Sequence, residues 1–133
     1  ARQNPHGKVT CMAYRVEEHG CSVVYAPDAG YPPGGPSEKV IDLYRGADLL
    51  IHDATYTPED RAQRLARGYS SFADAALAAT RAQVRRLALF HYDQDYTDDQ
   101  VDDCWRRCRA LLDEIGGRNI ELIAAREGLT VKL

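Results

Sequence analysis

The sequence predicts a layered α/β domain built on a mixed sheet. Apolar runs typical of buried strands alternate with segments of helical periodicity through the middle of the chain, and a strand pair is expected at each end. The alternation favours parallel strands joined by helices, whereas the terminal hairpins require antiparallel pairing. A strictly parallel, doubly wound sheet therefore fits less well than a mixed one.

Length and composition indicate one domain, residues 1–133. The chain has 133 residues, 44% of them hydrophobic, and a net charge of −3 without a basic stripe for a nucleic-acid backbone. No apolar run reaches the roughly 18 residues of a membrane span, and no signal peptide is visible, so we expect a cytoplasmic protein. The segment ARQNPHGK begins without Met and carries no strand signal, which is compatible with a piece of a longer protein.

The first elements are expected to be a β-hairpin and a long loop. Strands at 9–16 and 21–26 flank EEHG, whose glycine suits a tight turn. The proline- and glycine-rich segment DAGYPPGGPSEK then leaves the sheet and is expected to overhang Asp28. Cys11 and Cys21 could face each other across the hairpin, and all four cysteines are expected to be reduced thiols.

Capping residues mark the helices. Ser37 can cap a short helix that ends at Gly46, and Thr57 with Pro58 opens a polar helix through about Arg67. The segments SSFADAALAATRAQ and YTDDQVDDCWRRCRALLDEIGG each begin with hydroxyl caps, and the second is expected to bury its two cysteines. NIELIAA and LTVKL are predicted as two closing strands.

Three apolar runs end in residues that can bind a metal ion. SVVYAPDAG ends near Asp28, ADLLIHDATY near His52 and Asp53, and RRLALFHYD near His91 and Asp93. Burying a carboxylate or an imidazole beside a hydrophobic layer costs several kcal/mol unless a partner such as a divalent cation is present. Metal-dependent chemistry is therefore the first hypothesis, with a turn aspartate at Asp28 and core imidazoles as the structural alternatives.

His52 and Asp53 are adjacent, so on a strand their side chains face opposite sides of the sheet. Only one of them can point into a given site, and Asp53, followed by Ala54 and Thr55, could turn into a cleft. Asp28 and His91 supply too few donors for a complete divalent site. His6 could reach the same cleft, whereas His19 in the EEHG turn is expected to be exposed.

The order of PHG, AYRV, SVVYAPDAG, ADLLIHDATY, GYSSFADAALAA, RRLALFHYD and AAREGLTVKL resembles the C-terminal half of a metallo-β-lactamase-fold hydrolase. The branch it resembles contains ribonuclease Z and related phosphodiesterases. The resemblance implies an αββα sandwich, of which this chain would supply about half, with two zinc ions, or manganese or iron, in a cleft at the strand ends.

The same resemblance implies roles for individual residues. Asp28 would bridge both ions, His91 would be the last histidine ligand, and His6 would match a third ligand. Asp53 would replace a glutamate that helps to move protons. Tyr69 stands where a catalytic histidine is expected, and a phenol is a hydrogen-bond donor rather than a base at neutral pH.

The signature HxHxDH, which supplies most of the metal ligands in that family, is absent from the chain. The resemblance therefore implies an N-terminal half, in the same protein or in a partner chain, and homo-oligomers are also conceivable. The expected function is hydrolysis of a small-molecule or nucleotide phosphodiester. The alternatives are a degenerate non-catalytic scaffold and a receiver-type domain that binds magnesium through Asp28 and Asp53.

Overall fold

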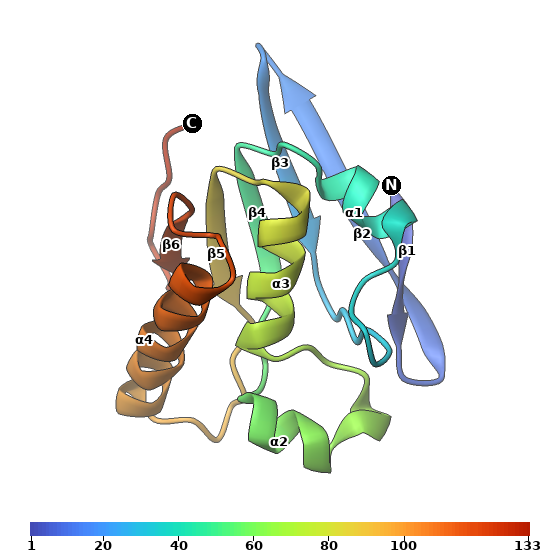
Figure 1. The fold of residues 1–133 in the computed structure, drawn as a ribbon, viewed down its shortest axis with the longest axis vertical. Helices are drawn as coiled ribbons and strands as arrows, with labels where there is room; N and C mark the ends of the chain where they lie inside the picture. The colour runs from blue at the N-terminus through green and yellow to red at the C-terminus, as the bar shows by residue number, and fades with distance from the viewer.

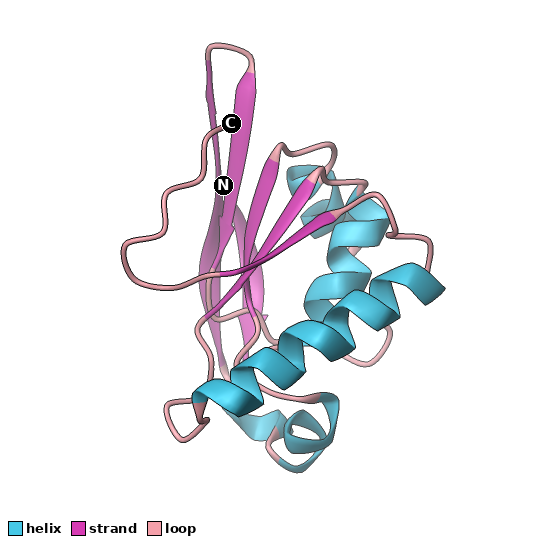
Figure 2. Cartoon of the chain, turned by 90° about the vertical axis from the view of Figure 1, so that its left-hand side faces the viewer, coloured by secondary structure: helices cyan, strands magenta, loops and turns pink.

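A computed structural model describes all of residues 1–133 as one sheet with helices packed on one of its faces (Figure 1, Figure 2). The six strands lie in chain order across the sheet. They are β1 (Arg2–His6), β2 (Val9–Glu18), β3 (Cys21–Ala26), β4 (Leu49–Asp53), β5 (Arg86–Phe90) and β6 (Glu121–Ala124).

Strand direction decides where the strand ends meet. β2 is antiparallel to both β1 and β3, and β3 to β6 are mutually parallel. Every strand except β2 therefore runs in one direction, and their carboxyl ends lie along the same edge of the sheet. This mixed sheet confirms the predicted fold class.

The helices begin where the capping residues predict. Thr57 Oγ1 accepts from Asp60 N, and capping boxes formed by Ser71 with Asp74 and by Thr97 with Gln100 start the two longest helices. The helical elements are α1 (Glu38–Tyr44), α2 (Pro58–Gln63), the 3₁₀ turn η1 (Leu65–Arg67), α3 (Phe72–Ala82) and α4 (Asp98–Glu114). None of these helices is long and apolar enough to cross a membrane.

The core lies between the sheet and the helices. Register places Val24, Leu50, Leu87 and Leu122 in one row across β3 to β6, and all four side chains are buried. The alanine-rich face of α3 lies close to this row because small side chains permit close packing on a sheet. Cys104 and Cys108 of α4 are buried in the same core, as expected.

The opposite face of the sheet carries no helix (Figure 2). A second row crosses this face and begins with Tyr14, 49% exposed, and Tyr25, 42% exposed. Val16, on the same face of β2, is 63% exposed. An apolar sheet face of this kind is typical of a layer that another layer covers. The remaining members of the row are Ile51, Ala88 and Ile123.

The N-terminal segment forms β1, which sequence analysis missed. Asn4 and Pro5 are weak strand formers, and the segment has no apolar alternation. Proline is tolerated on an edge strand, where its missing N–H leaves no internal ladder bond unmade. Tertiary contacts complete the strand, because Pro5 O accepts from Gly30 N and the buried Asn4 Nδ2 donates to Tyr44 Oη.

The predicted closing strand pair is wrong. Residues 129–133 form no strand, and β6 pairs only with β5, in parallel. The turn at Glu127 and Gly128 exists, but the segment after it does not return in register with β6. The receiver-type alternative is also excluded, because that fold requires helices on both faces of a parallel sheet.

Cys11 and Cys21 do not face each other. Register pairs Cys21 with Glu18 within the hairpin and pairs Cys11 with Asn4 of β1. All four thiols are free. The hairpin turn consists only of His19 and Gly20, so Cys21 lies beside the end of β2. Cys11 lies near the start of β2, at the opposite end of the hairpin.

Candidate metal centre

The predicted site residues gather at the edge of the sheet where the parallel strands end, the lower edge in Figure 1. Short contacts link neighbouring members of the group, which comes from five different segments. These residues are His6, the last residue of β1, Asp28 after β3, Asp53, the last residue of β4, Tyr69 before α3, and His91 after β5.

Asp28 and His91 face each other at the centre of the group. Asp28 Oδ1 lies 3.7 Å from His91 Nε2, beyond hydrogen-bond distance, and the two side chains are 35% and 43% exposed. Both residues have positive φ, +44° and +62°, a region that non-glycine residues rarely occupy. Strained backbone at the ends of two strands is typical of functional sites, where the surrounding structure holds it in place.

Asp53 is fully buried and ties three loops together. Its Oδ2 accepts from Ala29 N at 3.0 Å and from Ser70 N at 3.1 Å. Its Oδ1 accepts from Thr55 N at 2.9 Å and from Thr55 Oγ1 at 2.6 Å. These bonds hold the segment that follows Asp28 and the segment that carries Tyr69 against the end of β4.

His91 is linked to Asp53 through Thr55. Thr55 Oγ1 lies 2.9 Å from His91 Nδ1, while Asp53 Oδ1 is 3.8 Å from the same nitrogen. The carboxylate of Asp53, with a smaller contribution from Asp28, raises the pKa of His91 against the opposing effect of burial.

Tyr69 lies between the two histidines. Its ring centroid is 4.9 Å from that of His6 and 5.4 Å from that of His91. Burial raises the pKa of Tyr69, and the negative charges of Asp28 and Asp53 raise it further. The phenol therefore keeps its proton at neutral pH and can donate a hydrogen bond.

Three glycines allow the backbone crossing that holds His6. A Cβ on Gly30 would lie 2.1 Å from Gly68 O, and a Cβ on Gly68 would lie 1.9 Å from Gly7 N. Only glycine permits such close approach of three main-chain segments. The crossing brings Gly68 O to 2.9 Å from His6 Nδ1, and a carbonyl can only accept, so Nδ1 carries the proton.

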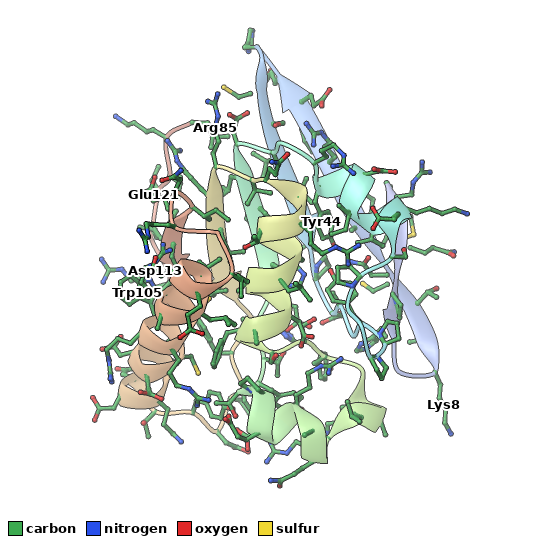
Figure 3. The ribbon with its side chains drawn as sticks, in the orientation of Figure 1. Lys8, Tyr44, Arg85, Trp105, Asp113 and Glu121 are labelled. Carbon is green, nitrogen blue, oxygen red and sulfur yellow. The ribbon has the colours of Figure 1, made fainter.

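His52 lies on the other face of β4 and does not enter the group. It is fully buried, its Nδ1 donates to Asp53 O at 2.7 Å, and its Nε2 accepts from Tyr31 Oη at 2.7 Å. Tyr31 Oη contacts Tyr44 Oη at 2.8 Å, and Tyr44 lies inside the molecule at the end of α1 (Figure 3). Burial lowers the pKa of His52, so this histidine is a neutral core residue.

The donor atoms fit part of a divalent metal site. Two bonds of about 2.1 Å at a tetrahedral angle separate their donor atoms by roughly 3.4 Å, close to the 3.7 Å between Asp28 Oδ1 and His91 Nε2. Carboxylate oxygen with imidazole nitrogen suits zinc, manganese or iron. No group of three or more His, Cys, Asp or Glu side chains in the chain is placed to hold a metal ion. Asp28 and His91 alone are too few donors for a divalent site.

Sequence analysis did not predict that three further residues contact Asp53 or Asp28 in this group. Thr55 follows Asp53 by two residues, a spacing at which a hydroxyl can bond a nearby carboxylate, so its position was a usable signal. Ser70, which donates to Asp53, depends on the loop crossing and left no signal. Cys11 lies with its Sγ 4.0 Å from Asp28 Oδ2, a contact that depends on strand register alone.

Comparison with known proteins matches residues 1–92 to the family described as "Beta-lactamase superfamily domain". Over 85 residues the chain is 41% identical to ribonuclease Z of Sulfurisphaera tokodaii, covering 64% of this chain and 27% of that protein. Over 111 residues it is 29% identical to ribonuclease BN of Escherichia coli, covering 80% and 36%. The chain thus spans between about a quarter and about a third of the length of these curated relatives.

Solved structures share the fold. The metallo-β-lactamase fold protein YhfI from Bacillus subtilis aligns with a TM-score of 0.74 at 22% identity, covering 96% of this chain and 46% of that one. The short form of human tRNase Z aligns with a TM-score of 0.67 at 22% identity, covering 98% and 39%. In both alignments the present chain corresponds to less than half of the other protein.

Proposed function

Because the chain belongs to the beta-lactamase superfamily, we propose that it forms part of a metal-dependent hydrolase that cleaves phosphodiesters through a dinuclear site. The observation that carries the proposal is the pair Asp28 and His91, whose donor atoms face each other 3.7 Å apart at the strand ends. The family implies a metal cofactor, and zinc is the ion proposed here, with manganese or iron as alternatives.

Asp28, His91 and His6 are the residues proposed to hold the metal ions. Divalent ions lower the pKa of a bound water and polarise the phosphoryl oxygen. Tyr69, protonated at neutral pH, would donate a hydrogen bond to a non-bridging or leaving oxygen of the substrate. Asp53 is buried and would influence proton movement through Thr55 and His91 rather than by contact with substrate.

We propose that the missing ligands come from an additional segment that covers the open sheet face. That face carries no helix (Figure 2) and exposes Tyr14, Val16 and Tyr25, and a second sheet packed on it would complete a sandwich. The segment would belong to the same protein or to a partner chain. The relatives named ribonuclease Z and ribonuclease BN favour RNA as the phosphodiester.

The decisive experiment combines metal analysis with hydrolysis in the complete protein. About two metal ions per protein, and cleavage of bis(p-nitrophenyl) phosphate, are expected. Each of Asp28→Ala and His91→Ala should lower metal content and reduce the rate at least 100-fold. His19→Ala and Asp42→Asn, which change exposed side chains far from the site, are the matched controls.

Absence of bound metal in the complete protein would refute the proposal and leave the non-catalytic scaffold as the better description. Metal-dependent activity that survives in His91→Ala would refute the role of that residue alone. Cleavage of the chromogenic diester without cleavage of an RNA substrate would retain the phosphodiesterase and reject RNA.

A further inference from the structure

Thr55 places a hydroxyl between a buried carboxylate and a proposed metal ligand. The residue is 5% exposed, and its Oγ1 lies 2.6 Å from Asp53 Oδ1 and 2.9 Å from His91 Nδ1. The backbone N–H of Thr55 donates to the same carboxylate oxygen at 2.9 Å. Both groups of Thr55 are thus oriented by Asp53, and the hydroxyl has little freedom to rotate.

Counting hydrogens determines the direction of each bond. A hydroxyl has one hydrogen, and a carboxylate oxygen only accepts, so Thr55 Oγ1 gives its hydrogen to Asp53 Oδ1. Towards His91 the same oxygen can then act only as an acceptor, and Nδ1 must be the donor. In a neutral imidazole with its proton on Nδ1, Nε2 has a free electron pair.

We propose that Thr55 is a positioning residue that selects the metal-competent tautomer of His91 and aims its Nε2 at Asp28. The inference deepens the proposed function and rests on it. Nε2 lies 3.7 Å from Asp28 Oδ1, which is too far for a hydrogen bond. Both atoms can donate an electron pair, and a metal ion could lie between them. Bonds to the second ring nitrogen fix tautomer and orientation in metal-binding histidines.

The arrangement at His6 supports this assignment from an independent contact. His6 Nδ1 donates to a main-chain carbonyl, Gly68 O, which leaves its Nε2 free in the same way. His91 Nδ1 has no main-chain acceptor and depends on the threonine hydroxyl, in turn oriented by Asp53. A single side-chain substitution can therefore remove the control of the tautomer at His91 but not at His6.

Zinc affinity of the complete protein gives the first test. Thr55→Val keeps the shape of the side chain without the hydroxyl and should weaken zinc binding, measured by competition with a chromophoric chelator, about 10- to 100-fold. Thr55→Ser should keep affinity within about threefold of the parent. Thr80→Val is the matched control, because the buried Thr80 Oγ1 has no hydrogen-bond partner. The zinc affinity of this variant should equal that of the parent.

Nitrogen-15 NMR of the metal-free protein, recorded at a pH at which the imidazole of His91 is neutral, gives the second test. The proton of His91 should reside on Nδ1 in the parent and in Thr55→Ser, and should shift towards Nε2 in Thr55→Val. A proton on Nε2 in the parent overturns the inference even if Thr55→Val does not fold. Parent-like zinc affinity in a folded Thr55→Val also overturns it, whereas a parent that binds no zinc refutes the proposed function instead.

Discussion

At the scale of single residues, the site depends on buried groups that do not face solvent. Asp53 accepts four hydrogen bonds and orders the segments beside Asp28 and Tyr69. His52, its neighbour in sequence, carries out a similar task on the other face, where it holds Tyr31. Two adjacent residues at the end of β4 thus hold one loop from both sides of the sheet.

Asp53→Asn should lower the free energy of unfolding by about 3 kcal/mol, because the amide nitrogen, in place of either carboxylate oxygen, would face at least one backbone N–H and leave it unpaired. Urea unfolding measures the loss. Asp42→Asn, which changes an exposed partner of Arg45, should alter stability by less than about 0.5 kcal/mol. Equal effects of the two substitutions would contradict the role given to Asp53.

His52 should make stability depend on pH in the acidic range. Burial lowers its folded pKa below the ordinary value of about 6.5, so the unfolded chain binds the proton more readily. Its contribution is complete above about pH 7 and is lost as the pH falls through 6.5 towards the folded pKa, by up to about 1.4 kcal/mol per pH unit.

Urea unfolding of the parent and of His52→Gln at pH 8 and pH 5.5 tests this sign. The parent should lose more stability between the two pH values than the variant does. The raised pKa of His91 acts in the opposite direction but is present in both proteins, so it cancels in the comparison. A larger loss in the variant would contradict the expectation.

At the scale of elements, the site is organised by loops that cross rather than by the strands themselves. The crossing of the segments at Gly7, Gly30 and Gly68 brings the end of β1 to the loop before α3. Arg61 of α2 reinforces the crossing by bonding Asp74 and Tyr69 O. These contacts position His6 and Tyr69 relative to His91.

Gly30→Ala should separate the crossing segments, because its Cβ would lie 2.1 Å from Gly68 O, and should lower stability by at least about 2 kcal/mol. Gly46→Ala tests conformational freedom alone, since it has positive φ but open space, and should cost about 1 kcal/mol. Thermal unfolding measures both. If Gly30→Ala lowers stability no more than Gly46→Ala does, the close approach of the loops at Gly30 and Gly68 is not important for stability.

At the scale of the whole molecule, helices cover one face of the sheet, and the other face is uncovered except where residues 129–132 lie against β5 and β6 (Figure 2). The uncovered face exposes large apolar side chains on β2 and β3, including Tyr14, Val16 and Tyr25. Apolar patches of this extent on isolated domains favour association. Under the proposed function, one additional layer would both cover this face and provide the metal ligands that the chain lacks.

The isolated chain should therefore self-associate through this face. Replacing Val16 and Tyr25 with Lys and Glu should shift its sedimentation towards monomer in analytical ultracentrifugation. Leu65→Glu is the control, since Leu65 is 57% exposed on η1, away from the face, and should leave association unchanged. In the complete protein the double substitution should instead lower the melting temperature. Monomeric behaviour of the unmodified chain would contradict this use of the face.

Sequence analysis predicted where the helices begin, because the caps at Thr57, Ser71 and Thr97 are local signals. It was wrong about the end of the second helix, which stops at Gln63 and is followed by the 3₁₀ turn η1 instead of continuing to Arg67. It missed β1 because the segment has weak strand propensity, although it pairs with the neighbouring β2 and also bonds the distant Gly30 and Tyr44. It also predicted a final strand that the structure does not contain. The segment at Asn4 lacks strand propensity but finds acceptors and donors, whereas LTVKL has the propensity but finds no partner strand.

The sequence by itself determined the α/β class, the mixed sheet and the strand-end positions of Asp28, Asp53 and His91, because apolar periodicity and capping act over a few residues. Only the tertiary structure decided that His6 joins them, that His52 does not, and that Thr55 connects Asp53 to His91. Those outcomes depend on strand direction, register and loop crossings, which are set by contacts between residues distant in the chain.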